Sequence, residues 1–264
     1  METTNRRPEK GGAVTTTRVD LHVKVLDEEV VARAKDRGLD VLVYAPHFTR
    51  WPAIRERAAR FSDDDLLVVP GRELFTGDWH SRRHVLALDL DRPIPDFCTL
   101  TGTMAELDAQ DATVLVPHPG FLTVSLGREE LVQYRDGVDA IETYNPKHFP
   151  WDNRNARQLA TEFDIPAFTS SYAHRKATVG EAWTTFETGI DTEADLLAAI
   201  EDGVERRIEH REGVTHRVRC ALEFGHLAWE NSWEKLDRVY LSGMEPTHPG
   251  HVAYDGVFDD VRVY

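Results

Sequence analysis

Short apolar runs alternate with amphipathic segments along most of this chain, and that alternation constrains the fold more than any other feature. Near-continuous apolar strands separated by helical stretches indicate a parallel sheet buried on both faces. Seven runs rich in β-branched and apolar residues cover 15–23, 39–47, 65–74, 84–90, 112–118, 138–145 and 165–174. Seven such units favour a closed or nearly closed α/β barrel over an open doubly wound sheet.

The remainder of the chain predicts helices. A short helix is expected around residues 192–203, followed by a long helix from about Arg211 to Leu241. The long helix carries enough apolar and aromatic surface to cover the barrel or to form a dimer interface. The sequence therefore leaves open whether the chain forms a homo-oligomer. We predict a barrel over residues 15–185 with a helical extension over 186–264 packed on it as one structural domain.

Charge restricts the partners of this 264-residue chain. Its net charge is −15, and it has 25 arginines against 6 lysines. An acidic, lysine-poor surface fits a halophilic protein and equally an ordinary acidic protein of a GC-rich genome. It argues against broad nucleic-acid binding, which needs clustered cations, although a nucleic-acid end or monomer could enter a local pocket. With no apolar run typical of a signal peptide or a membrane span, the sequence predicts a cytoplasmic protein without a membrane partner.

Histidines gather at the ends of the predicted strands. A lone histidine there would more often be a hydrogen-bonded structural residue than a ligand. Because the carboxyl ends of barrel strands share one mouth, several of them together predict a convergent site. Four lie at the carboxyl ends of strands, His84 begins a strand nearby, and an acid joins them: His22, His47, His118, His174 and Glu73.

The ordered motifs resemble the polymerase and histidinol phosphatase (PHP) superfamily. That family has a seven-stranded, distorted, TIM-like (β/α)7 barrel and the motif series H-x-H, T-D-H, G-x-E, H-x-L, H-P and S-D-A-H. The segments that carry the resemblance are DLHVK, GLDVLVYAPH, VPGREL, HVLAL, VPHPG, IETYN and SSYAH, in that order between Val19 and Gly180. Each motif is weak by itself, but the ordered series is specific.

The resemblance implies metal-dependent phosphoester hydrolysis. Carried over, Glu73 matches the acid that bridges two metals in the family. The matching imidazole ligands are His22, His47, His84, His118 and His174. Imidazoles with a bridging carboxylate suit zinc, manganese or iron, which can polarise a phosphoryl oxygen and activate water.

Three positions depart from the family pattern. Lys24 stands where the second histidine of H-x-H belongs, Pro46 replaces the acid before His47, and Tyr172 replaces the aspartate of S-D-A-H. A full three-metal cluster is therefore not expected. We expect one divalent ion on Glu73, His84 and His118, and leave open a second on His47 and His174.

Two functions follow from this reduced site. In the first, the chain hydrolyses a small phosphorylated substrate, with Glu73 as a catalytic metal ligand and Lys24 replacing a metal as an electrostatic clamp on phosphate. Further phosphate contacts are predicted from basic residues near the mouth: Arg83, Lys147, Arg175 and Lys176. In the second, the barrel has lost catalysis and serves as a binding or regulatory protein. Asp20, Glu142 and Asn145 are expected either to orient the histidines or simply to cap strand ends.

Overall fold

A single nine-stranded sheet organises the computed structural model, which describes residues 15–78, 81–120, 124–226 and 246–263. The sheet order is β7-β6-β5-β4-β3-β2-β1-β8-β9. The strands are β1 (Thr17–Val23), β2 (Val41–Tyr44), β3 (Leu67–Thr76), β4 (Arg83–Leu88), β5 (Thr113–Val116), β6 (Ala140–Tyr144), β7 (Ala167–Thr169), β8 (Ala182–Phe186) and β9 (Arg206–His210). All seven predicted strands are present.

The sheet curls into a nearly closed barrel, which confirms the predicted α/β barrel class. Its terminal strands β7 and β9 contact each other, and β7 also meets β8. Thr169 of β7 and Thr184 of β8 exchange two hydrogen bonds, from the Thr169 amide to Thr184 Oγ1 at 2.9 Å and from that hydroxyl to the Thr169 carbonyl at 3.0 Å. Side-chain bonds therefore help to close the ring of strands.

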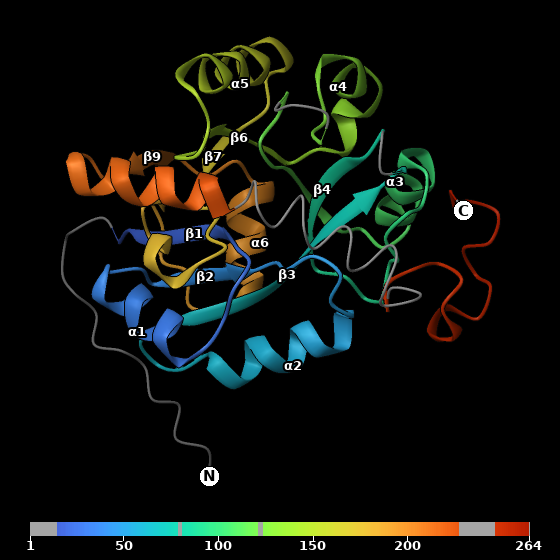
Figure 1. Cartoon of the computed structure of the whole chain (residues 1–264), viewed down its shortest axis with the longest axis horizontal. Coiled ribbons are helices and arrows are strands. Elements are labelled where there is room, and N and C mark those ends of the chain that lie inside the picture. The colour runs from blue at the N-terminus through green and yellow to red at the C-terminus, as the bar shows by residue number, and fades with distance from the viewer. Residues whose placement is uncertain (1–14, 79–80, 121–123, 227–245, 264) are drawn as a thin grey trace.

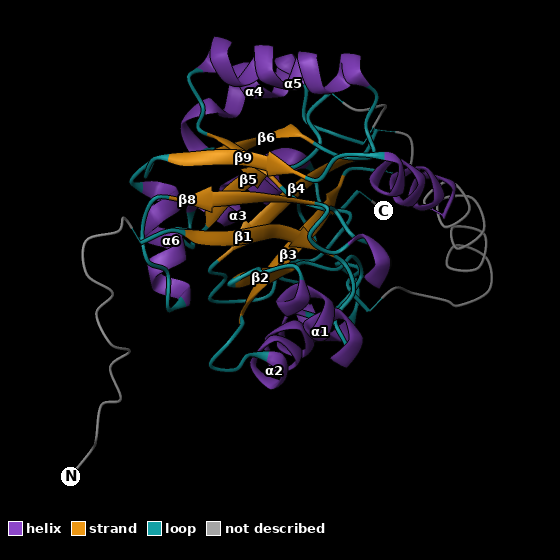
Figure 2. Cartoon of the chain, turned by 90° about the vertical axis from the view of Figure 1, so that its left-hand side faces the viewer, coloured by secondary structure: helices purple, strands orange, loops and turns teal. Residues whose placement is uncertain are grey.

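Not all strands run parallel, contrary to the sequence expectation. β4 is antiparallel to both β3 and β5, and β8 is antiparallel to both β1 and β9. Only residues 77–82 join β3 to β4. A link that short cannot make the crossover that parallel pairing requires, so the two strands form a hairpin. The other seven strands share one direction, as β1 and β9 do in Figure 2.

Helices surround the sheet (Figure 1), with α1 and α2 on one side and α4 and α5 on the other (Figure 2). They are α1 (Glu28–Asp36), α2 (Trp51–Phe61), α3 (Leu100–Asp108), α4 (Arg128–Tyr134), α5 (Pro150–Phe163) and α6 (Glu193–Glu201), with short 3-10 turns at Arg135–Gly137, Lys176–Thr178 and Val252–Tyr254. No helix among the described residues combines the length and apolarity that crossing a bilayer requires.

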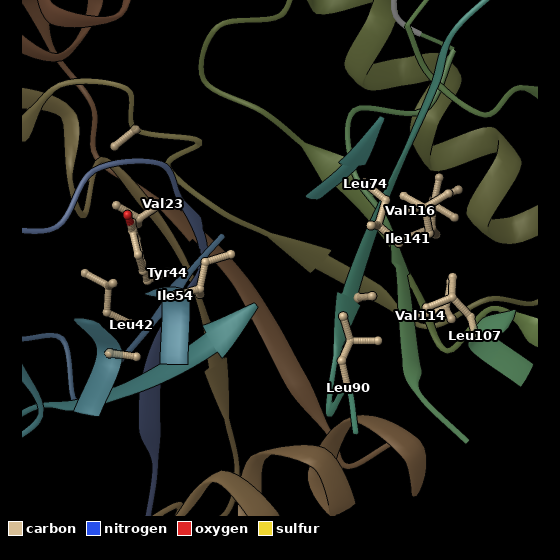
Figure 3. Close-up of a cluster of buried hydrophobic side chains, with 14 of the residues drawn as sticks. Val23, Leu42, Tyr44, Ile54, Leu74, Leu90, Leu107, Val114, Val116 and Ile141 are labelled. Carbon is tan, nitrogen blue, oxygen red and sulfur yellow. The ribbon is translucent and has the colours of Figure 1, made fainter. Parts of the chain in front are cut away.

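Two large apolar clusters form most of the core of the described residues. One lies between sheet and helices and includes Leu42 and Ile54 (Figure 3). The other fills the barrel interior with alternate strand residues such as Leu21 and Val43, and it includes α6 side chains. The Thr113 hydroxyl, at the start of β5, donates a 2.9 Å hydrogen bond to Glu201 of α6. α6 therefore closes the amino-terminal end of the barrel and leaves the carboxyl end for the site.

The expectation of a short helix and then a long helix after the barrel missed two strands. β8 and β9 lie on either side of the expected short helix, α6. β9 has the sequence RRIEH and no buried residue, so no apolar run announces it. Charged residues are common on an edge strand, where they discourage further pairing. The predicted boundary at residue 185 thus falls inside β8. Of the predicted long helix, residues 214–226 are helical, and 227–241 lie outside the described residues.

Candidate metal centre

The carboxylate of Glu73 lies at the centre of a buried group of imidazoles. Glu73 is fully buried in β3. Its Oε1 lies 3.1 Å from His84 Nδ1 and 2.9 Å from His118 Nε2. Its Oε2 lies 3.1 Å from His22 Nε2 and 3.0 Å from His47 Nε2. Each carboxylate oxygen therefore faces two ring nitrogens, the arrangement expected of residues that could share a metal ion.

Strand direction explains why these histidines meet. His22 lies near the end of β1, and His47 and His118 follow β2 and β5, so all three stand at the carboxyl ends of parallel strands. His84 begins β4 instead. Because β4 is antiparallel, its first residues lie at the same end of the barrel. The antiparallel hairpin thus delivers His84 to the mouth.

Lys24 occupies the Oε2 side of the carboxylate. Its ammonium forms an ion pair with Glu73 Oε2 and donates a 2.9 Å hydrogen bond to the Ala45 carbonyl. The side chain is 6% exposed, so this positive charge is withdrawn from water. A buried ammonium needs such partners. The same oxygen that faces His22 and His47 therefore also has a fixed cation beside it.

Tyr172 fills the space beside this pair. Its ring centroid lies 4.8 Å from that of His22 and 5.0 Å from that of His118, and Lys147 Nζ lies 4.5 Å from the Tyr172 ring. Tyr172 has φ 49° and His118 has φ 37°, a left-handed backbone that is uncommon for residues other than glycine and is often found at functional sites. The aromatic ring thus stands where the family pattern has a carboxylate.

His174 is separate from the Glu73 cluster. Its Nδ1 faces the Tyr172 carbonyl at 3.1 Å, and its backbone amide donates to Glu223 Oε1 at 2.6 Å. Within the described parts of the chain, no hydrogen bond joins His174 to Glu73. The structure therefore brings four of the five predicted imidazoles together on Glu73, and His174 turns to its own loop.

The four predicted phosphate-binding residues have different surroundings. Arg83 pairs with Glu130 at 2.6 Å, and Lys176 pairs with Glu29 of α1. Arg175 is exposed. Lys147 alone among the four lies against the cluster, buried between the Tyr172 carbonyl and Glu223.

Buried carboxylates hold the loops that carry the site. Glu142 Oε2 accepts a 2.8 Å hydrogen bond from the His118 amide, and its Oε1 accepts one of 2.7 Å from the Ser170 hydroxyl. Asp20 accepts hydrogen bonds from the amides of Ser171 and Gly180 at 2.9 and 3.1 Å. Burial raises the pKa of Glu142 to about 7 and that of Asp20 to about 6, although these hydrogen bonds oppose the shift.

Asn145, the third expected support, acts through Glu142. Its side-chain amide donates to Glu142 Oε2 at 3.0 Å, and its backbone amide donates to Asn153 Oδ1 of α5 at 2.9 Å. These predicted supports therefore hold backbone and loop rather than imidazole rings.

Two supports were not predicted from the sequence. Ser125 Oγ lies 2.7 Å from His118 Nδ1 and orients that ring while its Nε2 faces Glu73. Glu223, in the helix of residues 214–226, accepts hydrogen bonds from the backbone amides of His174 and Arg175. Its carboxylate also lies 3.4 Å from Lys147 Nζ. Neither residue belongs to a motif, so only its position in the fold identifies it.

Burial favours the neutral, metal-binding form of three imidazoles of the cluster. Burial lowers the pKa of His22, His47 and His118 well below 6.5, and the positive charge of Lys24 adds to the effect at His22 and His47. Neutral imidazole is the form that ligates a metal. The Nδ1 atoms of His22 and His47 are buried and have no hydrogen-bond partner among the described residues.

The residues present fit one metal ion better than two. Within the described ranges, the group whose ligand atoms all lie within 4.8 Å of one another is His47, Glu73 and His84. His118 contacts the same Oε1 as His84. Three protein ligands with an open position are typical of catalytic sites. The Oε2 side, which Lys24 and Tyr172 crowd, offers less room for a second cation.

Comparisons with known proteins agree with this fold. The family model described as PHP-associated matches residues 150–204, from α5 through β8 to the end of α6. PsfC from Pseudomonas syringae PB-5123 superposes with a TM-score of 0.59 at 21% identity, covering 81% of this chain and 98% of PsfC. No curated protein is similar enough in sequence to count as a relative.

Two further solved structures share the architecture. The lesion-specific endonuclease EndoQ from Pyrococcus furiosus has a TM-score of 0.54 at 16% identity, and the match covers 74% of this chain but only 58% of EndoQ. An amidohydrolase from Chromobacterium violaceum, with bound sulfate and no metal, has a TM-score of 0.51 at 14% identity, covering 71% of this chain and 97% of the other.

The PHP-associated model covers residues 150–204 alone, and the solved structures, each under 25% identical, show a shared fold. Both findings agree with the resemblance to the PHP superfamily that the motif series indicates.

Proposed function

We propose that this protein hydrolyses a small phosphoester with the help of one divalent metal ion. The observation that carries the proposal is the Glu73 carboxylate, fully buried, with two imidazole nitrogens within 3.1 Å of each of its oxygens. A cluster that had lost all function would be expected to drift onto backbone partners. Four of the histidines face Glu73 instead.

Glu73, His84 and His118 would hold the ion, with His47 as a further ligand. Zinc, manganese and iron all suit this donor set. When bound, such an ion polarises a phosphoryl oxygen and makes water a nucleophile near neutral pH. Ser125 fixes the His118 ring, and the burial of these side chains keeps bulk water away from the site.

Lys24 would supply the second positive charge at the site. It stands on Glu73 Oε2, opposite the oxygen shared by His84 and His118. From there its ammonium attracts the phosphoryl group and stabilises charge that develops during hydrolysis. Lys147, buried beside Tyr172, adds to the positive potential around that ring: its Nζ lies 4.5 Å from the ring centroid, and that of Lys24 lies 5.8 Å from it.

The neighbouring structures support an anionic substrate. Sulfate, a tetrahedral oxyanion like phosphate, is bound in the amidohydrolase that shares this fold. EndoQ acts on DNA, so a nucleic-acid substrate is the nearest alternative within hydrolysis. The net charge of −15 favours a small phosphoester over a long phosphate backbone.

One observation favours the alternative, a noncatalytic binding protein. Lys24 already neutralises Glu73, and His174 is turned onto the Tyr172 carbonyl. A barrel stabilised in this way no longer needs a metal to offset its buried carboxylate. In that case the cluster would bind an anion without hydrolysing it.

Metal content and turnover together test the proposal. Elemental analysis of the untagged protein purified without chelators is expected to give about one ion per chain, as a single site on Glu73 would. His118→Ala should lose the ion and the hydrolysis of small phosphoesters, whereas the control His251→Ala, outside the cluster, should keep both. If the protein binds no metal after soaking with zinc and manganese and shows no turnover, the proposed hydrolysis is contradicted and the noncatalytic binding protein is favoured.

A further inference from the structure

Four arginine side chains gather around the buried carboxylate of Glu181. They come from α1 and its C-terminal cap, from the residue after β9, and from the helix of residues 214–226, orange in Figure 1. We call them the arginine cluster: Arg33, Arg37, Arg211 and Arg219. The loop between β7 and β8 packs on α1 and brings Glu181 to these side chains. Three segments that are distant in sequence thus place their positive charges together.

Glu181 has direct contacts with only two of the four arginines. Its Oε1 accepts hydrogen bonds from Arg37 at 2.7 Å and from Arg219 at 2.9 Å. Its Oε2 lies 2.6 Å from His216 Nδ1. Both carboxylate oxygens are therefore occupied, and neither is left for a further guanidinium.

Arg33 and Arg211 make their hydrogen bonds to backbone carbonyls instead. Arg33 donates to the carbonyl of Ala177 at 3.3 Å, and Arg211 donates to that of Gly180 at 3.3 Å. Within the described ranges, no carboxylate forms an ion pair with either guanidinium, and the exposed Asp36 acts on Arg33 only from a distance. The cluster therefore has more positive charge than its carboxylate neutralises, in a protein of net charge −15.

The guanidinium groups also repel one another. Burial lowers the pKa of Arg33 and of Arg37, and the other arginines of the cluster lower it further against the opposing charge of Glu181. The Nε atom of Arg33 is buried and has no hydrogen-bond partner among the described residues. A buried donor without an acceptor is costly. Because the Arg33 side chain is partly exposed, it can turn and offer this donor to an anion.

Arg211 is held in position before any ligand binds. Its Cζ lies 5.7 Å from the centroid of the Trp183 ring, and a second hydrogen bond runs from its Nη2 to the Arg37 carbonyl at 3.4 Å. A guanidinium presents a planar fork of N–H donors that matches the oxygens of a phosphate group. Forks from separate segments contact one tetrahedral oxyanion from different sides.

We infer that the arginine cluster binds a phosphate-type oxyanion, either free phosphate or the terminal phosphate of a larger ligand. The inference goes beyond the proposed hydrolysis and does not depend on it. Within the described residues, no hydrogen bond or ion pair of these arginines reaches Glu73 or its imidazoles. The bound anion would join α1 to the helix of residues 214–226, since Arg33 and Arg219 belong to those two elements.

Calorimetric titration of the full chain with inorganic phosphate, at constant ionic strength and after removal of metal, tests the inference. Arg33→Gln should weaken phosphate binding by about tenfold, as the loss of a charge-assisted hydrogen bond does. Arg211→Gln should act in the same direction and serves as a second variant if the first folds poorly. Arg157→Gln is the matched control, because Arg157 is an exposed arginine of α5 and its replacement changes the net charge equally. Its phosphate affinity should stay within about twofold of the wild type.

Lys147→Met distinguishes the arginine cluster from the Glu73 cluster. If phosphate binding survives in Arg33→Gln and Arg211→Gln but is lost in Lys147→Met, phosphate binds beside Glu73 alone and the inference is wrong. Absence of phosphate binding by the wild type would also overturn it. So would an equal weakening in Arg157→Gln, since that result reports only the change in net charge.

Methylphosphonate identifies the source of the phosphate group, because it carries a substituent and lacks a bond that phosphoester hydrolysis cleaves. Equal affinities for methylphosphonate and phosphate would indicate a site for the phosphate end of a larger ligand. Phosphate binding at least about tenfold tighter would indicate a site for free phosphate. Either result supports the site when Arg33→Gln weakens the binding.

Discussion

Glu73 and Glu181 are both buried near the carboxyl end of this barrel, and their partners differ. Glu181 is fully buried and accepts hydrogen bonds from Arg37 at 2.7 Å, Arg219 at 2.9 Å and His216 at 2.6 Å. Glu73 is equally buried but faces four imidazoles and one ammonium.

The partners decide what each carboxylate can do. Arginine is permanently charged and cannot ligate a metal, so the arginines fix Glu181 as an anion that fastens the helix of residues 214–226 to the barrel. Burial raises the pKa of Glu181, but hydrogen bonds from His216 and Arg219 outweigh it and leave the pKa below its ordinary value. Neutral imidazoles, in contrast, leave Glu73 able to share a metal. One carboxylate is a structural clamp and the other a candidate reaction centre.

The largest expected effect comes from Glu73. Glu73→Gln keeps the size of the side chain but removes the carboxylate, so metal content should fall to near zero and kcat/KM by about 10³. Elemental analysis and initial rates measure both. Adding Lys24→Met to Glu73→Gln removes the ammonium that would otherwise lose its partner, and it separates misfolding from loss of function. A variant that retains metal would show that the ion binds elsewhere.

The matching change at Glu181 should affect stability instead. Glu181→Ala leaves Arg37 and Arg219 without their buried anion, which costs about 3–5 kcal/mol of unfolding free energy. Urea denaturation measures this loss. The control Glu187→Ala breaks the more exposed pair with Arg207 and should cost less than about 1 kcal/mol. Equal losses of unfolding free energy in Glu181→Ala and Glu187→Ala would show that the Glu181 ion pairs do not fasten the helix to the barrel.

Acidification should distinguish imidazole burial from arginine pairing. Burial lowers the pKa of His148 to about 3, so the unfolded chain, with its pKa near 6.5, takes up the proton first. The stability due to the neutral ring is present above pH 6.5 and is lost as the pH falls toward 3. Between pH 7 and pH 5, the unfolding free energy of His148→Gln should therefore fall by about 2 kcal/mol less than that of the wild type. Urea denaturation at the two pH values measures both. An unchanged pH dependence would contradict a buried neutral ring.

The smallest effect distinguishes two lysines that the sequence treats alike. Lys147→Met removes a buried ammonium beside the Tyr172 ring, and kcat/KM should fall by about tenfold. Lys176→Met breaks only an exposed pair with Glu29, so its rate should stay within about twofold of the wild type. Steady-state rates on one phosphoester decide between them. Equal losses of kcat/KM in the two variants would indicate that Lys176 also contacts the substrate.

The sequence by itself determined the barrel and most of the cluster. Apolar runs with strand length specify buried strands locally, and a residue directly after such a run lies at the barrel mouth in any closed arrangement. For that reason Glu73, His22, His47 and His118 could be predicted without coordinates. β9 could not, since an exposed edge strand has no apolar pattern to reveal it.

Only the tertiary structure decided what surrounds those residues. Glu223 binds the loop after β7 from a helix 49 residues further along the chain. The turn of His174 toward the Tyr172 carbonyl and the contact of Ser125 with His118 depend on how the loops at the barrel mouth fold. Strand periodicity reports which face a side chain takes within its own element. It carries no information on which side chain of another element lies opposite, because the packing of the whole chain sets the distance between the two side chains.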